Sequence, residues 1–209
     1  MDRHTAHPLM VELRRTDRLT SLAGRLMTTV IIIDVVVSVL ALAILGADAA
    51  DPDAVQFVRI VYAVFIGAQI ATALTLAAWS RRTVDNVILL GGDGSRAIAA
   101  LGWVIPVGHL VLPFLELGTA ARSIGADHPA LGRWHGAFVA AFVATLLPFS
   151  VSPEMAFVFT AASIVLLVIA AGAARMAMEH LDDTIYDRAR VSARGERGEE
   201  GVVDHCSQI

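Results

Sequence analysis

The sequence predicts an all-α integral membrane protein, with four transmembrane helices and one proline-broken segment that is either re-entrant or a fifth span. Three observations predict this class. Of the 209 residues, 56% are hydrophobic and only 17% are charged. The apolar residues gather in five stretches, each near the roughly 20 residues that cross a bilayer as a helix. The longest polar segment is a C-terminal tail of about 34 residues, too short for a separate core.

The N-terminal residues 1–25 carry five arginines, and apolar residues recur on the opposite side at helical spacing. This pattern is typical of an amphipathic helix that lies in the plane of an anionic leaflet. We therefore predict a cytoplasmic amphipathic leader. The first span follows over about 26–47, and it is longer than the apolar region of about 7–15 residues in a secretory signal, so we expect it to be retained.

The other three predicted spans are almost free of charge. Residues 60–80, 134–153 and 155–174 contain no Asp, Glu, Lys or Arg. The complete membrane domain is expected over 26–175, with the four spans at about 26–47, 56–80, 134–151 and 155–175. The tail over 176–209 mixes both charge signs with glycine and has few apolar residues, so we predict that it is cytoplasmic and largely disordered.

The fifth apolar segment, over 97–121, is interrupted by Pro106 and Pro113. Proline removes a backbone donor and disturbs the preceding helical turn. If this segment spans, the 16 arginines divide eight to eight between the two membrane faces. If it enters and leaves on one face, they divide fifteen to one, as the positive-inside rule expects. We favour the re-entrant path with both termini cytoplasmic, and five kinked spans remain the alternative.

A set of motif residues lies around this broken segment. An aromatic at a helix end is followed by Arg and Asn, then by a Gly-Trp-x-x-Pro element, a second proline and a further Trp. The residues are Trp79, Arg82, Asn86, Gly102, Trp103, Pro106, Pro113 and Trp134. Their order and spacing, over residues 26–180, resemble a bacterial multi-pass membrane family, frequent in actinobacteria, catalogued as domain of unknown function 4328. The resemblance implies a non-spanning segment and no known activity. His109 stands where that family often has asparagine.

Three polar residues are expected at membrane depth: Asp34, Gln69 and His109. A charged carboxylate near the bilayer centre costs about 2.5–3.5 kcal/mol on insertion scales, so Asp34 is expected to face protein or water. The three side chains could form a cluster on a path for a proton, a cation or a small molecule. The alternative is that they only hydrogen-bond neighbouring helices together.

The remaining residues argue against catalysis and cofactors. The one cysteine, Cys206, excludes an internal disulfide, and the histidines show no metal-ligand spacing. The run from Val87 to Ser95 imitates the strand and glycine loop of some kinases, but no α/β domain supports it, so we interpret it as a flexible turn.

We therefore predict a non-catalytic scaffold or partner-binding module without metal or cofactor; the alternative is a small transporter or channel that uses the Asp34 cluster. Its expected partners are the lipid bilayer and either a protein partner or further copies of the chain, and nucleic acid is not among them. Arginine and alanine in place of lysine and asparagine indicate a bacterium with a GC-rich genome, so the expected location is the bacterial cytoplasmic membrane.

Overall fold

The computed structural model describes residues 8–46, 52–105, 108–146 and 153–206. Within these ranges the secondary structure is helical throughout, which confirms the all-α part of the predicted class. The elements are α1 (Pro8–Gly46), α2 (Pro52–Leu89), α3 (Arg96–Leu101), the 3-10 helix η1 (Gly108–Leu110), α4 (Leu112–Ser123), α5 (Pro129–Leu146) and α6 (Pro153–Cys206). Pro106 of the motif lies outside the described residues.

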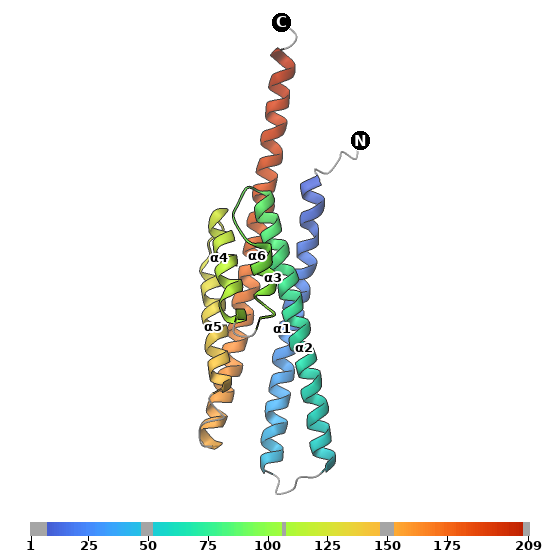
Figure 1. Cartoon of the computed structure of the whole chain (residues 1–209), viewed down its shortest axis with the longest axis vertical. Helices are drawn as coiled ribbons and strands as arrows, with labels where there is room; N and C mark the ends of the chain where they lie inside the picture. Colours follow the sequence, from blue (N-terminus) through green and yellow to red (C-terminus); the bar gives the residue numbers. More distant parts are fainter. Residues whose placement is uncertain (1–7, 47–51, 106–107, 147–152, 207–209) are drawn as a thin grey trace.

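Two helical hairpins form the body of the molecule (Figure 1). Helices α1 and α2 pack antiparallel along their length, α5 packs antiparallel on α6, and α1 joins the hairpins by packing on α6. The short elements α3, η1 and α4 connect α2 to α5 in the upper half of the body (Figure 1).

Long apolar segments lie in three of the helices. Among the described residues, Arg18–Leu40, Arg59–Leu89 and Val158–Ser192 are long and apolar enough to cross a membrane. The predicted span over 134–151 begins in α5, whose described part ends at Leu146. The lengths and composition of these helices are those of a helical membrane protein.

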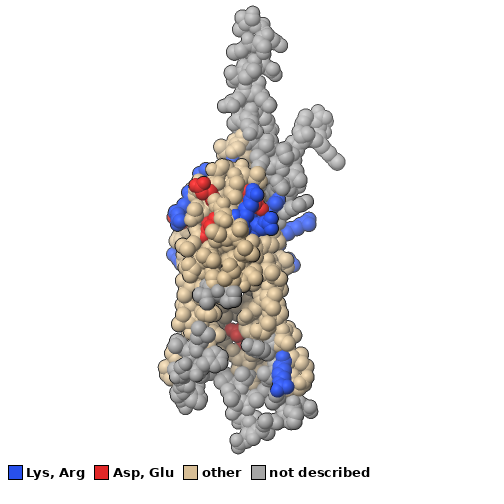
Figure 2. All heavy atoms as spheres, in the orientation of Figure 1, with Lys and Arg blue, Asp and Glu red and all other residues tan. Residues whose placement is uncertain are grey.

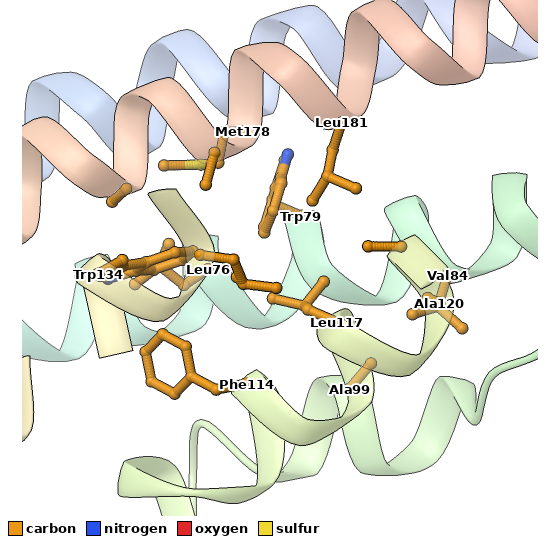
Figure 3. Packing of buried hydrophobic residues seen from close by; sticks show 14 of the residues in the cluster. Leu76, Trp79, Val84, Ala99, Phe114, Leu117, Ala120, Trp134, Met178 and Leu181 are labelled. Atoms are coloured by element: carbon orange, nitrogen blue, oxygen red, sulfur yellow. The ribbon is translucent and has the colours of Figure 1, made fainter. Parts of the chain in front are cut away.

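The buried core lies in the upper half of the body, where α2, α4, α5 and α6 meet. Figure 3 shows Trp79 of α2 pointing toward α6, near Met178 and Leu181, with Phe114 and Leu117 of α4 on the other side. The lower half presents large apolar side chains instead, among them Ile32, Val36, Val39, Ile60, Val64 and Ile70. Charged side chains gather over the upper part of the described surface, and the surface below is mostly uncharged (Figure 2).

The N-terminal leader differs from its prediction. It is not a separate in-plane helix, because α1 runs without a break from Pro8 to Gly46. The described end of its apolar stripe packs on α6: Ala23 is fully buried, and Thr20 donates a hydrogen bond over 2.6 Å to Asp182. The contact with α6 therefore fixes the direction of the leader.

The tail differs as well, because α6 continues as a helix to Cys206. Small and apolar residues recur every three or four positions beyond the expected span and remain buried against the body. They are Ala177, Met178, Leu181, Ile185 and Ala189. This stripe supports the helix through its charged region, and the end of α6 then projects beyond the rest of the body (Figure 1).

Candidate functional site

The three tryptophans, far apart in the sequence, form one buried aromatic cluster. Trp103 stacks on Trp134 with ring centroids 5.8 Å apart, and the Trp79 ring is 6.3 Å from that of Trp134. Phe114 of α4 meets Trp134 edge-on at 5.0 Å. Aromatic pairs at these separations and angles stabilise a contact beyond the area they bury. The cluster joins α2, α4 and α5 to Trp103, which lies two residues past the end of α3.

A hydrogen bond fixes the orientation of Trp103. Its Nε1–H donates over 2.8 Å to the Ser80 hydroxyl oxygen, and both side chains are buried. Gly102 allows the backbone before Trp103 to pack closely on Pro113 of α4, because a Cβ atom on Gly102 would lie 3.0 Å from the Pro113 ring. The Gly-Trp element therefore has a packing role: it connects α2 to the start of α4.

The other motif residues on α2 lie above Trp79. Asn86 is 1% exposed and Arg82 is half-buried. Of the eight motif residues, the structure brings Trp79, Gly102, Trp103, Pro113 and Trp134 into this one region of contacts.

Asp182 is a buried polar residue that sequence reasoning missed, since it fell in the region expected to be disordered. It is only 6% exposed and accepts the hydrogen bond from Thr20 that ties α6 to α1. The apolar periodicity that continues through Ile185 and Ala189 was the available signal, because it predicts that the helix stays packed beyond residue 175.

The glycine-rich run after α2 forms an ordered cap. Gly91 has φ +80°, its N–H donates to the Ile88 carbonyl over 3.0 Å, and the Gly92 N–H donates to the Val87 carbonyl over 2.9 Å. This pair of bonds is the Schellman arrangement that ends many helices. Because residues 87–89 are helical, the run lacks the strand that a phosphate-binding loop requires.

The same run packs tightly on α4. The Asp93 N–H donates over 3.0 Å to the Ser123 hydroxyl, and the Ser95 N–H donates to the Glu116 carboxylate. A Cβ atom on Gly92 would lie 2.6 Å from the Ser123 oxygen. The start of the segment between α2 and α5, at Asp93, therefore contacts its end, at Ser123.

The three predicted intramembrane polar residues do not bond to one another. Asp34 is half-buried on α1 and Gln69 is exposed on α2, and no hydrogen bond or ion pair joins either side chain to another described residue. The His109 ring lies against Phe138 and Phe142 of α5, at 5.9 and 5.8 Å. Because η1 packs on α4 and α5, His109 is separated from the α1 side chain of Asp34.

A histidine pair was also not anticipated. His128 accepts a hydrogen bond on Nδ1 from the Ala130 N–H over 3.1 Å and so caps α5, while its ring centroid is 4.4 Å from that of His180 on α6. Among the described residues, no group of three or more His, Cys, Asp or Glu side chains could hold a metal ion.

Comparisons with known proteins gave no relative. No family model matches the chain, and no curated protein or solved structure matches it.

Proposed function

We propose that the chain is a multi-pass protein of the bacterial cytoplasmic membrane that acts without catalysis, as a scaffold or partner-binding module. In this proposal four helices span, the segment between α2 and α5 is re-entrant, and both termini are cytoplasmic. The observation that carries the functional proposal is that α6 continues as a helix to Cys206 and projects beyond the rest of the body, where a partner could reach it.

Three exposed arginines support the position of the membrane. The contact between Thr20 and Asp182 aligns α1 with α6, and the contact between Thr145 and Ser163 aligns α5 with α6. At 1.5 Å per residue, these contacts place Arg25, Arg133 and Arg175 within about 3 Å of one height. Arginines at one level are typical of the cytoplasmic interface.

The helix lengths below this level support the same placement. From Arg25 to the end of α1 at Gly46 the helix is about 31 Å long, and from Arg175 back to the start of α6 it is about 33 Å long. Both values match a hydrocarbon core of about 30 Å. The level of the three arginines thus fits one membrane face, with the ends of both hairpins near the other.

The broken segment penetrates only partly in this placement. His109 contacts Phe138 and Phe142, which lie about 8 and 14 Å below Arg133 along α5. The chain then returns through α4, whose last residue, Ser123, bonds to Asp93. A segment that reaches about 10 Å and ends where it began supports the re-entrant path over a fifth span.

The partner-binding role is supported by the reach of α6. From Arg175 to Cys206 the helix extends about 46 Å past the proposed membrane surface. The last buried residue described on it is Ala189, and Val191 is already 70% exposed. A helix that the body holds as far as Ala189, and that continues beyond it, can present a binding surface at a fixed distance from the membrane.

Site-specific photo-cross-linking in cells tests this role. A photoreactive residue is placed in turn at Arg194, Arg197 and His205, and at the lipid-facing control position Val39. We expect protein adducts of discrete mass from the α6 positions and none from Val39. Adduct patterns that are equally weak at all four positions contradict the partner-binding role.

A transporter is the second candidate, and the position of Asp34 favours it, because a carboxylate at membrane depth is common on ion pathways. Reconstitution into liposomes separates the two functions. The scaffold proposal expects no proton or cation flux above that of empty vesicles. Flux that appears with the protein and disappears in Asp34→Asn establishes the transporter instead.

A further inference from the structure

Asp34 and Gln69 lie on the inner faces of α1 and α2. Asp34 follows Ala23, Met27 and Val30 at helical spacing, and those three residues are buried or half-buried. Gln69 follows Phe65 at the same spacing and precedes the buried Leu76. Both polar side chains are therefore on the side of the hairpin that faces the rest of the body, away from the lipid-facing residues.

The inner face of the α1–α2 hairpin is only partly covered around Asp34 and Gln69. Gln69 is exposed although it shares a stripe with Leu76, which is 6% exposed one and a half to two turns above it. Counted from the lower ends of the helices, Asp34 is about 18 Å up α1 and Gln69 is about 26 Å up α2. The two groups are thus a carboxylate and an amide on one inner surface, offset by about 8 Å.

The depth makes the missing partner significant. Asp34 is nine residues past Arg25, or about 14 Å below the level of the arginines, near the centre of the membrane. No described residue donates a hydrogen bond to the Asp34 carboxylate or forms an ion pair with it. Polar groups at this depth normally pair with another group or line a hydrated cavity.

The chain does not carry the complementary charge at that depth. It has no lysine, and no arginine occurs within 26–58, 60–80, 97–121 or 134–174. A second copy in the same orientation therefore offers Asp34 no arginine or lysine within the membrane. A cation that pairs with Asp34 within the membrane would therefore have to come from another protein.

We propose that the inner face of the α1–α2 hairpin around Asp34 and Gln69 binds a transmembrane helix of a different protein, one that carries an arginine or lysine near mid-membrane. The cation pairs with the Asp34 carboxylate, and the Gln69 amide accepts or donates a hydrogen bond one and a half turns away. This inference rests on the proposed membrane-spanning partner-binding function and adds to it an intramembrane site with a defined chemistry.

A synthetic helix tests the site directly. The full-length protein and a poly-leucine transmembrane peptide with one central arginine are labelled for energy transfer and reconstituted together in liposomes. We expect the arginine peptide to associate at least tenfold more strongly than the same peptide with leucine at that position. Asp34→Leu should abolish the difference, and Asp34→Asn should retain a few-fold preference, because the amide still accepts a hydrogen bond.

Position on the helix is the matched control. Val36 is 45% exposed on the lipid-facing side of α1, two residues from Asp34. The double variant Asp34→Leu with Val36→Asp keeps a carboxylate at nearly the same depth but on the outer surface. We expect it not to restore the preference for the arginine peptide, and intrinsic tryptophan fluorescence reports whether each variant retains its folded core.

Two results would overturn the proposal: equal binding of the arginine and leucine peptides by the wild-type protein, or full restoration by the double variant. Both are separable from a failure of the proposed function, since cross-linking at the α6 end is measured independently of Asp34. If the α6 adducts persist while the peptide preference is absent, only the intramembrane site is wrong.

Discussion

The backbone N–H of Asp93 donates a hydrogen bond to the Ser123 hydroxyl over 3.0 Å, which joins positions 30 residues apart in the chain. Between them the chain forms α3, η1 and α4, so this one contact closes the whole connection between the two hairpins. The connection also supplies Trp103 and Phe114 to the tryptophan cluster. The hydrogen bond thus closes the same connection whose aromatic residues pack the two hairpins together.

The bond from Trp103 to Ser80 should contribute measurably to stability. We expect Ser80→Ala to lower the free energy of unfolding by about 1–3 kcal/mol, because it leaves the buried indole N–H without its acceptor. Unfolding by SDS in mixed micelles, followed by tryptophan fluorescence, gives this value. The exposed Ser21 is the control, and Ser21→Ala should change stability by less than about 0.5 kcal/mol. Equal effects of the two substitutions contradict the assigned bond.

The two glycines Gly92 and Gly132 should respond in opposite directions to a methyl group. A Cβ atom on Gly92 meets both Ser123 and Val87 at 2.6 Å, so Gly92→Ala should destabilise by about 1–3 kcal/mol. A Cβ atom on Gly132, within α5, has open space around it, and Gly132→Ala should stabilise by up to about 1 kcal/mol. The same SDS titration measures both. A neutral Gly92→Ala would show that the loop does not pack on α4 as described.

The contact between Thr20 and Asp182 should couple the leader to α6. We expect Asp182→Ala to cost about 1.5–3 kcal/mol, because it removes a hydrogen bond to a charged group in a buried position. Its neighbour Asp183 is exposed, and Asp183→Ala should stay within about 0.5 kcal/mol of the wild type. In a double-mutant cycle, Thr20→Val and Asp182→Ala should be non-additive. Simple additivity rules out a direct interaction.

The helical class could be predicted from the sequence because it follows from a strong local constraint. Long apolar stretches must satisfy their own backbone hydrogen bonds in lipid, and the described parts of the four predicted spans lie in α1, α2, α5 and α6. The ends of these helices were less predictable. The leader and the tail looked separate from the membrane domain because they are charged, yet Ala23 and Ile185 pack within the body and continue α1 and α6.

The candidate site was predictable only in part, for a related reason. The motif contained Trp79, Trp103 and Trp134, but its spacing did not indicate that their rings pack together or that Ser80 holds Trp103. Those contacts depend on how α3 packs on α2. Conversely, similar estimated depths suggested that His109 joins Asp34. Depth alone does not specify which side of the body a residue occupies, and His109 packs on α5.

The central claim is that the segment between α2 and α5 enters and leaves the membrane on the cytoplasmic face, and cysteine accessibility tests it most directly. In a Cys206→Ser background, single cysteines replace Asp93 and Asp127, both exposed and on either side of the segment, and Ala50, which is expected on the outer face. Intact cells are treated with a membrane-impermeant maleimide. We predict that Ala50→Cys is labelled at once, whereas Asp93→Cys and Asp127→Cys are labelled only after permeabilisation. Labelling of Asp127→Cys but not Asp93→Cys in intact cells would contradict the re-entrant path and establish a fifth span.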